Sequence, residues 1–433
     1  MLSTVIIAIL TCIFLILSVL FLPKIKIFNF EISTYWLVCL IGATLIIAFG
    51  DISITEVFNG LTNTSAINPL KILVLFVSMT FLSVFLDEVG FFKFLAVLAT
   101  KKAKNNQFSL FFILYFIVAI LTIFTSNDIV ILTFTPFICY FAKSTKINPA
   151  PYLVAEFAGA NTWSMMLIIG NPTNIYLATS AGIDFISYFK VMALPTLFAG
   201  IIQVVVILLI FRKALLKPLE LQVEDVKLTN KPYTVIGIEH LVICLLLLVI
   251  SSYISIDMWL ICFICAISLI IFIVISSLLR HQRPIVLKNT AKRLPWELIP
   301  FVISMFIIVL ALQKQNVTEV ISNWLSKDYA IWKYGFASFL SCNLMNNIPM
   351  SVLFSTIPNF ANPLLQNQAI YSTIIGSNIG AFLTPIGALA GIMFTDLIAK
   401  QKVKYTFLSF IKYGVIIAIP TILGALLGLS IVL

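Results

Sequence analysis

The sequence predicts an all-α polytopic membrane protein built from inverted repeats, each with a re-entrant helical hairpin and a broken transmembrane helix. The chain has 433 residues, of which 61% are hydrophobic and 10% are charged, whereas soluble domains contain about 25% charged residues. Several apolar runs are long enough, at about 18 residues or more, to cross a bilayer as helices. Polar residues interrupt other apolar runs at matching places in the two halves of the chain.

Two polar breaks lie in each half. The first half contains TSND (Thr125–Asp128) and GNPTN (Gly170–Asn174), and the second contains MNNIP (Met345–Pro349) and LTPIG (Leu383–Gly387). Free backbone N–H and C=O groups are costly in lipid, so such breaks persist only where protein or a water-filled cavity satisfies them. Broken helices at corresponding places in two halves are typical of the substrate site of a secondary transporter.

The distribution of positive charge predicts which loops face the cytoplasm. The formal net charge is +10, and most of the 27 Lys and Arg residues fall in short connections near 24–26, 101–104, 143–146, 212–231, 280–293 and 400–404. Under the positive-inside rule these connections are all cytoplasmic. The first apolar run (Val5–Leu22) lacks a charged n-region and a cleavage site, so we expect a retained helix.

One topology satisfies this charge distribution. In the first half we expect spans near 4–22, 35–50 and 69–88, an amphipathic segment at 90–103, a hairpin at 107–142, a broken helix at 150–181 and a return span at 188–211. Two unbroken spans follow near 235–254 and 257–279. The second half repeats the order with a span at 297–313, an amphipathic segment (Val317–Leu325), a hairpin at 329–358, a broken helix at 367–399 and a final span at 405–432.

The hairpin at 107–142 is flanked by lysines at both ends, so it enters and leaves on one side, with TSND at its tip. Counting membrane crossings places the open end of the second hairpin outside, where its exit (Asn359–Ile370) carries no charge. The two halves are therefore predicted to be inverted relative to each other. The alternative is that both hairpins span the membrane fully.

We predict four regions: scaffold helices with a first interfacial helix (1–103), half of a transport domain (104–212), a linker with scaffold helices and a second interfacial helix (213–328), and the other half of the transport domain (329–433).

Each break is typical of the start of a half-helix. Candidate capping side chains occur at Asn171-Pro172, Thr384-Pro385, Asn347 with Pro349, and Ser126, Asn127 or Asp128. Pro is tolerated at the first helical position, because its missing N–H would be unpaired there anyway. Four helix N-termini would then meet at mid-depth, each with free N–H groups and a partial positive charge. The alternative is that these are ordinary proline kinks.

That array favours an oxyanion or a neutral oxyacid as substrate, while the unwound carbonyls and the Asn, Ser and Thr oxygens suit a proton carrier or a small cation. If sodium is the coupling ion, we expect it at Asn127, Asp128 and Asn346. The predicted binding residues come from the breaks and the helices beside them: Ser126, Asn127, Asp128, Asn161, Gly170, Asn171, Pro172, Thr173, Asn174, Asn346, Asn347, Pro349, Ser377, Asn378, Thr384, Pro385 and Gly387.

Acidic residues inside a membrane are costly and are normally retained for transport. Asp128, at a hairpin tip, is the best candidate for ion coupling, although a role as a helix cap fits it equally well. Asp87 and Glu88 end a span near the cytoplasmic interface, and we expect a structural role for them. Glu156 and Asp396 lie near the outer ends of their broken helices, where we expect water to reach them.

The sequence has no pattern of a cofactor site, a metal centre or an enzyme active site. Its seven cysteines sit almost wholly in apolar segments, and its two histidines fall at span ends. Cys262 and Cys265 have a CxxC spacing, but the apolar helix around them favours packing over a metal or redox role. No pair of acids, and no nucleophile with a base, lies at a common depth, so we do not expect an enzyme.

Five segments together suggest a family. They are LDEVGFF (Leu86–Phe92), LPWELIPFVISMF (Leu294–Phe306), MNNIP (Met345–Pro349), IIGSNIGAFLTPIGALA (Ile374–Ala390) and YGVIIAIPTILGALLGL (Tyr413–Leu429). In order and spacing they resemble the ArsB-type arsenical pump family, in the ArsB/NhaD branch of the ion transporter superfamily, which is related to divalent anion/sodium symporters. The resemblance implies a scaffold domain, a mobile transport domain with two opposed hairpins, and export of arsenite or antimonite driven by protons or, in some systems, by a partner ATPase.

Three motifs depart from that family. ArsB-type proteins usually read G-[SN]-D-L-G-P-K after the second hairpin, whereas this chain has GSNIGAF (Gly376–Phe382), without the acid and the lysine. GNPTN differs from the S-N-L-x-N of arsenical pumps. SND at the first tip is intermediate between the F-x-N-D of ArsB and the Ser-Asn-Thr tips of sodium-coupled carboxylate carriers. Because losing a carboxylate can change the coupled ion, the resemblance implies the fold and leaves the substrate open.

We therefore predict a multi-pass secondary transporter of the cytoplasmic membrane that moves a small oxyacid or oxyanion by an elevator-like or rocking displacement. Proton-coupled efflux of arsenite or antimonite is the leading assignment. The alternatives are a sodium-coupled carboxylate or inorganic anion symporter, a sodium/proton antiporter, and a channel or ligand-binding regulatory protein. The expected partners are the substrate, a proton or sodium ion, the bilayer, a second copy in a homodimer and, by resemblance, an ATPase; we expect no nucleic acid and no cofactor.

Overall fold

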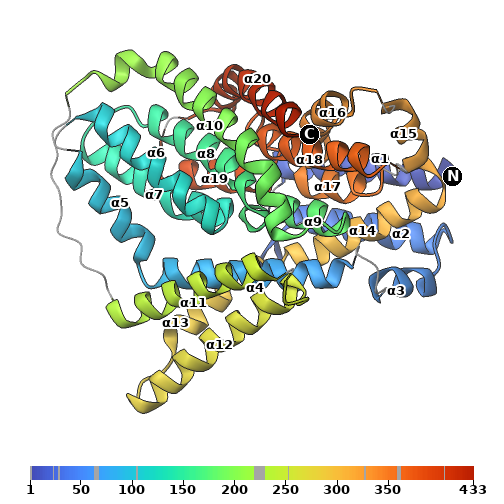
Figure 1. Cartoon of the computed structure of the whole chain (residues 1–433), viewed down its shortest axis with the longest axis horizontal. Helices are drawn as coiled ribbons and strands as arrows, with labels where there is room; N and C mark the ends of the chain where they lie inside the picture. The colour runs from blue at the N-terminus through green and yellow to red at the C-terminus, as the bar shows by residue number, and fades with distance from the viewer. Residues whose placement is uncertain are drawn as a thin grey trace.

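The computed structural model is almost wholly helical, and Figure 1 shows how the helices are arranged. The described residues are 2–22, 24–27, 30–62, 68–103, 106–218, 230–251, 253–325, 328–357, 362–403 and 405–433. Eight helices within these residues are long and apolar enough to cross a membrane, which confirms the predicted helical membrane fold. The linker at 219–229, residue 358 of the second hairpin with the start of its exit, and Lys104, Lys227 and Lys404 lie outside the described residues.

The N-terminal region contains scaffold helices and a short strand pair. Its elements are α1 (Leu2–Phe21), β1 (Lys24–Ile27), β2 (Phe30–Ser33), α2 (Thr34–Ala48), α3 (Ile54–Thr62), α4 (Pro69–Glu88) and α5 (Phe91–Lys102). Strands β1 and β2 pair antiparallel, with Lys24 opposite Ser33. The start of α4 is fixed by Asn68, whose side chain accepts hydrogen bonds from Leu70 N and Lys71 N. Helix α4 is largely buried, because α7, α9, α12 and α14 all pack against it.

The first hairpin and the first broken helix follow. The elements are α6 (Gln107–Phe124), α7 (Asn127–Ser144), α8 (Ala150–Trp163), the 3₁₀ turns η1 (Ser164–Met166) and η2 (Ile168–Gly170), α9 (Pro172–Ser180) and α10 (Phe185–Leu215). Thr125 and Ser126 join the two helices of the hairpin. Two short 3₁₀ turns separate α8 from α9, so the polar break at 164–171 interrupts the helix as predicted.

The second half repeats this order after a connecting region. Helices α11 (Lys231–Ile250), α12 (Met258–Leu279) and α13 (Ile285–Arg293) connect the halves, and α11 and α12 extend along the lower edge of Figure 1. Then come α14 (Leu298–Lys314), α15 (Val317–Leu325), α16 (Ala330–Met345), α17 (Asn347–Phe354), α18 (Pro363–Gly380), α19 (Leu389–Lys400) and α20 (Phe407–Val432). The inversion of one half relative to the other, and the re-entry of the hairpins, stay predictions.

Three short elements were not expected from the sequence: the β1–β2 pair, α3 and α13. They lie in connections where long apolar runs give no signal. Helix α3 begins near Glu56, whose carboxylate pairs with Lys314 Nζ at 2.8 Å. Hydrogen bonds from Lys314 and Ser53 lower the pKa of Glu56 to about 2. This ion pair links α3 to the end of α14, on the side that the charge pattern predicts to be external.

Glycines allow two helix pairs to approach closely. A Cβ on Gly376 of α18 would overlap Ser338 Oγ and the Gly335 carbonyl oxygen of α16, and would lie 2.8 Å from Phe339 N. Helices α10 and α20, the last helix of each half, also pack along each other. The close α16–α18 contact fixes the second hairpin against the second broken helix.

Gly376→Ala should therefore destabilise the protein by at least about 2 kcal/mol, because the added methyl meets backbone atoms that cannot rotate away. Gly424→Ala is the matched control, since the rotatable Cδ1 methyl of Ile202 is the one atom that an added Cβ would crowd there. Thermal unfolding in detergent measures both variants. Equal melting temperatures for the two would contradict the close packing of α16 on α18.

Candidate functional site

The tip of the first hairpin presents polar groups that the protein leaves unpaired. Ser126 is the N-cap of α7, yet its side chain makes no capping hydrogen bond. Asn127, which is 2% exposed, donates from Nδ2 to Asn161 Oδ1 of α8 at 3.1 Å. Within the described residues, Ser126 Oγ and Asn127 Oδ1 are buried without a hydrogen-bond partner. An unpaired buried polar group is unfavourable, so this tip is suited to receive a ligand.

The first break is closed by a capping asparagine, as predicted. Asn171 Oδ1 accepts hydrogen bonds from Thr173 N and Thr173 Oγ1, both at 3.1 Å, and Pro172 occupies the first turn of α9. A Cβ on Gly170 would overlap the Ser164 carbonyl, so glycine lets the two ends of the break approach each other. The break is thus a compact turn rather than a loose gap.

Asn378 of α18 joins this break to the second half. Its Oδ1 accepts from Ser164 Oγ at 3.0 Å and from Asn171 Nδ2 at 2.9 Å. Its Nδ2 donates to Asn174 Oδ1 at 2.7 Å and to Ile374 O at 2.8 Å. An asparagine amide has two donor hydrogens and an oxygen with two lone pairs, so Asn378 is fully satisfied. These contacts define the asparagine clamp: Ser164, Asn171, Asn174 and Asn378.

The second tip lies against the second break. Asn346 has a positive φ of 73° and caps α17 by accepting from Ile348 N at 3.3 Å. Its Nδ2 donates to Ile386 O at 3.0 Å, and Asn347 N donates to Gly387 O at 2.9 Å. The tip and the break thus satisfy one another's backbone groups. The predicted capping role of Asn347 is wrong by one position, because the chain turns at Asn346.

The predicted cap at Thr384-Pro385 is also wrong. Helix α19 begins at Leu389, and Thr384 lies in the irregular turn before it. Thr384 Oγ1 instead donates to Asn343 Oδ1 at 2.7 Å, and Asn343 Nδ2 donates to Gly380 O at 3.0 Å. Asn343 and Ser164 were missed from the sequence. Asn343 lies about one helical turn before Asn346 and Ser164 starts the polar break, so both positions carried a signal.

A cavity of about 600 Å³ reaches the first tip. Its walls come from α1, α2, α4, α7, α19 and the start of α14, and its polar lining residues are Lys24, Ser33, Tyr35, Thr80, Ser126, Asp128, Arg293, Glu297, Thr395 and Asp396. Its mouth lies among basic connections that the charge pattern places in the cytoplasm. We call it the cytoplasmic cavity. Residues from the first 103 positions, which were expected to be scaffold only, therefore contribute to it.

The charges of the cytoplasmic cavity are largely paired. Lys24 Nζ lies 3.8 Å from Asp396 Oδ2, and Arg293 is bound to Asp87 and, at 3.0 Å, to Glu88. Glu297 accepts hydrogen bonds from Ser33 N and Tyr35. Asp128 forms no ion pair within the described residues. The lining of the cavity therefore offers carboxylate and hydroxyl oxygens, and its two cations, Lys24 and Arg293, are already paired.

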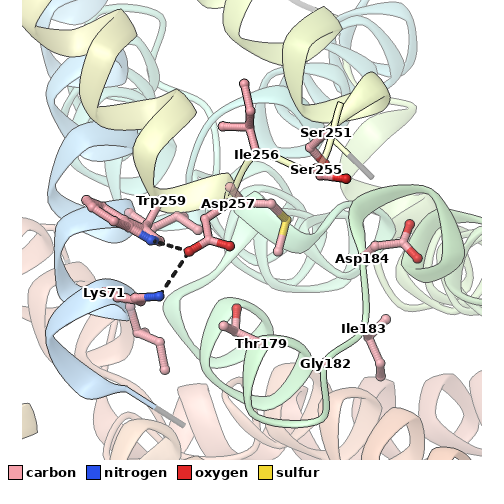
Figure 2. Close-up of a pocket in the computed structure, with 13 residues that line it drawn as sticks. Lys71, Thr179, Gly182, Ile183, Asp184, Ser251, Ser255, Ile256, Asp257 and Trp259 are labelled. Carbon is pink, nitrogen blue, oxygen red and sulfur yellow. Dashed lines mark hydrogen bonds and ion pairs between the residues drawn. The ribbon is translucent and has the colours of Figure 1, made fainter. Parts of the chain in front are cut away.

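A second cavity, of about 480 Å³, opens at the start of α4 and does not include predicted site residues. Figure 2 shows Asp257 accepting hydrogen bonds from Lys71 Nζ at 3.0 Å and Trp259 Nε1 at 2.9 Å, with Thr179 and Asp184 across the cavity. The hydrogen bond from Lys71, which has the larger effect, and the one from Trp259 hold the pKa of Asp257 below its usual value.

A packed layer lies between the two cavities. Helix α9 packs against α4 and α17, and α17 packs against α14. They surround a void of about 20 Å³, whose lining includes Thr173, Tyr176, Ile348 and Ser351.

The acids differ from one another in exposure. Asp396 is partly exposed, as predicted, and Asp87 and Glu88 hold Arg293 in the structural role that was expected. Glu156 contradicts its expectation, because it is 2% exposed in the interior of α8. Because Glu156 lies far along the chain from the break, we expected water to reach it, but α6, α7, α10 and α18 pack around α8.

These features define a multi-pass membrane transporter, because two helical hairpins and two broken helices meet around a polar cluster reached by one cavity. Residues 25–371 match the citrate transporter family, CitMHS, and the chain belongs to that family. The family is one of transporters rather than enzymes. With eight candidate spans among its described residues, the protein is a multi-pass membrane protein.

Relatives and solved structures agree with this assignment. An arsenical pump membrane protein of Escherichia coli is 26% identical over 410 residues, covering 90% of this chain and 92% of its own length. That of Yersinia enterocolitica is 24% identical over 374 residues, covering 82% and 85%. The YdaH transporter of Alcanivorax borkumensis shares the fold at 12% identity, with a TM-score of 0.54 over 99% of this chain and 98% of its own. MtrF of Neisseria gonorrhoeae, described within a class of antimetabolite efflux pumps, has the same TM-score at 13% identity over 99% and 94%.

Asn378→Ala tests whether the asparagine clamp is structural. The change leaves Asn171 Nδ2 and Asn174 Oδ1 unpaired, whereas Ser164 Oγ can still donate to Asn161 O at 2.8 Å, so we expect a loss of about 1–3 kcal/mol for each of the two unpaired groups. Asn362→Ala, which removes an exposed helix cap, should cost only about 1 kcal/mol. Thermal unfolding without substrate measures both. Unchanged stability together with lost substrate binding would make Asn378 a ligand rather than a clamp.

Proposed function

We propose that the protein exports arsenite or antimonite in exchange for protons. One observation supports this most directly: Ser126 and Asp128 line the cytoplasmic cavity, and the buried oxygens Ser126 Oγ and, next to it in the chain, Asn127 Oδ1 have no hydrogen-bond partner within the described residues. Hydroxyl groups of an uncharged trihydroxy acid can donate to these oxygens and accept from the free N–H groups at the start of α7. The names of the bacterial relatives agree with such a substrate.

The charge of the cavity favours a neutral oxyacid over a polycarboxylate. Asp128, Glu297 and Asp396 outnumber Lys24 and Arg293 in its lining, and both cations are paired with carboxylates. A tricarboxylate would need unpaired Arg or Lys side chains, which bind carboxylates by charge-assisted hydrogen bonds. Arsenous acid carries no charge at neutral pH, so it enters this cavity without electrostatic repulsion.

Sodium-coupled transport of a carboxylate or inorganic anion is the second candidate, and the citrate transporter family favours it. Asp128 and the free Asn127 Oδ1 are oxygen ligands of the kind that Na⁺ binds, and Asn346 lies at the other tip. In that case sodium would supply the positive charge that the cavity lacks. Sodium/proton exchange at the same oxygens is the third candidate.

We infer an alternating-access mechanism in which the two halves are inverted and both hairpins are re-entrant. Regions 104–212 and 329–433 would move as the transport domain against regions 1–103 and 213–328. The open cytoplasmic cavity and the packed layer of α9 and α17 beneath the second cavity support an inward-facing state. A homodimer fits such a scaffold, and an ATPase partner stays part of the proposal by analogy with arsenical pumps.

Transport in everted vesicles tests the substrate and the coupling ion. With an acidic interior, we expect labelled arsenite to accumulate, and Asp128→Asn to reduce this about tenfold or more, the effect of about 1.4 kcal/mol. Glu319→Gln changes an exposed acid on α15 and is the matched control. Accumulation of citrate that depends on sodium, without arsenite transport, would select the second candidate instead.

Thiol labelling tests the orientation and the state. We expect Thr395→Cys, in the cytoplasmic cavity, to react with a membrane-impermeant reagent supplied from the cytoplasmic side. Ser255→Cys, in the second cavity, should react from the opposite side. The unchanged chain supplies the background, because its cysteines are buried except for the partly buried Cys12. Labelling of Thr395→Cys from outside would reverse the predicted topology.

A further inference from the structure

Glu156 is a buried acid that the proposed substrate site does not use. It lies within α8 and is 2% exposed. Thr135 Oγ1 of α7 lies 3.0 Å from its Oε1 and 3.1 Å from its Oε2. A threonine hydroxyl has one hydrogen to donate, whereas an ionised carboxylate has about four lone-pair positions to satisfy. Burying a charge with so little compensation is strongly unfavourable.

Glu156 has no paired counter-charge within the described residues. No Lys, Arg or His there forms an ion pair with it. Helices α6 and α18 contain no charged residue. The charged residues of the other helices around α8 are Asp128 and Lys143 in α7, Lys190, Arg212 and Lys213 in α10, Asp396 and Lys400 in α19, and Lys412 in α20.

The α7 face toward Glu156 carries a thiol and, farther along, a lysine. Cys139 lies one turn after Thr135 and interacts electrostatically with Glu156. Lys143 lies one turn farther and donates to Gln401 O at the exposed end of α7. No cation pairs with the buried carboxyl within the described residues, and burial without a counter-charge favours its protonated form.

Among the described residues, side-chain hydrogen bonds join α7 to α8 at two places, and Glu156 makes one of them. The other is the hydrogen bond from Asn127 to Asn161 at the substrate tip. Thr135 lies eight residues after Asn127, which is about 12 Å along the helix. Ionisation of Glu156 would place a charge with a single donor inside the α7–α8 interface, which favours a different packing of the two helices and a different position of the tip, and a substrate that moves the tip would in turn release the proton.

From this geometry we propose that Glu156 binds the proton exchanged for substrate, and that the α7–α8 pair couples it to the tip. The proposal rests on proton-coupled export. An O–H bond forms at the carboxyl when a proton enters from the external side, and the same bond breaks when the proton leaves to the cytoplasm after substrate binds. In this assignment Asp128 contacts the substrate, whereas the exchanged proton binds at Glu156.

Purified protein in liposomes, with labelled arsenite as the probe, tests this assignment. Glu156→Gln mimics the protonated acid, so we expect it to lose accumulation driven by a pH gradient while it still exchanges arsenite between equal concentrations. Asp128→Asn should lose both activities. Glu319→Gln should keep both. Gradient-driven accumulation by Glu156→Gln at the wild-type level would overturn the proposal.

A second pair of variants keeps Glu156 itself. Thr135→Val removes the donor to the ionised carboxylate, so the pH midpoint of exchange should move about one unit toward alkaline pH. Thr135→Ser keeps the hydroxyl and should keep the midpoint. Equal midpoints for the two would overturn the proposal even if Glu156→Gln fails to fold. A wild-type protein that does not respond to the pH gradient would overturn the proposed function as well, which separates the two failures.

Discussion

The interior depends on satisfying polar groups where water and lipid cannot do so. Breaking a helix inside a membrane frees N–H and C=O groups whose cost is several times that of a lost surface hydrogen bond. The asparagine clamp removes much of this cost at the first break, because Asn378 uses all of its hydrogen-bonding capacity on Ser164, Asn171, Asn174 and Ile374. It also joins residues more than 200 positions apart, so the two halves share one centre.

The polar residues of the breaks divide into two groups by what they leave unpaired. The clamp residues bind one another and hold the backbone turns in shape. Ser126 Oγ, Asn127 Oδ1 and Ser377 Oγ have no partner within the described residues. The rigid clamp residues can hold these unpaired oxygens in position, because a ligand then binds to oxygens whose geometry is already fixed. Clustering of polar residues in the sequence identified both groups but could not separate them.

The sequence predicted the long elements well and the local turns less well. Apolar length and lysine positions predicted the order of spans, hairpins and broken helices, because these signals extend over many residues. The capping expectation held at Asn171 and failed at Thr384, because a Thr-Pro pair can bind a neighbouring helix as readily as start one. Glu156 was misplaced because burial depends on which helices pack around α8, and spacing along one helix does not contain that information.

The two tips are related in position but differ in chemistry. At the second tip, Asn346 Nδ2 and the backbone N–H of Asn347 donate to the carbonyls of Ile386 and Gly387, so these two groups are used within the protein. At the first tip, Asp128 lines the cytoplasmic cavity and forms no ion pair with any residue that the structure describes. A pair of similar half-sites would bind substrate equally from both sides, whereas an acid at one tip makes binding depend on which side is open. A single side chain in an otherwise similar pair of tips can therefore change the affinity for substrate between the two open states, while the net direction of transport follows the gradients of substrate and coupling ion.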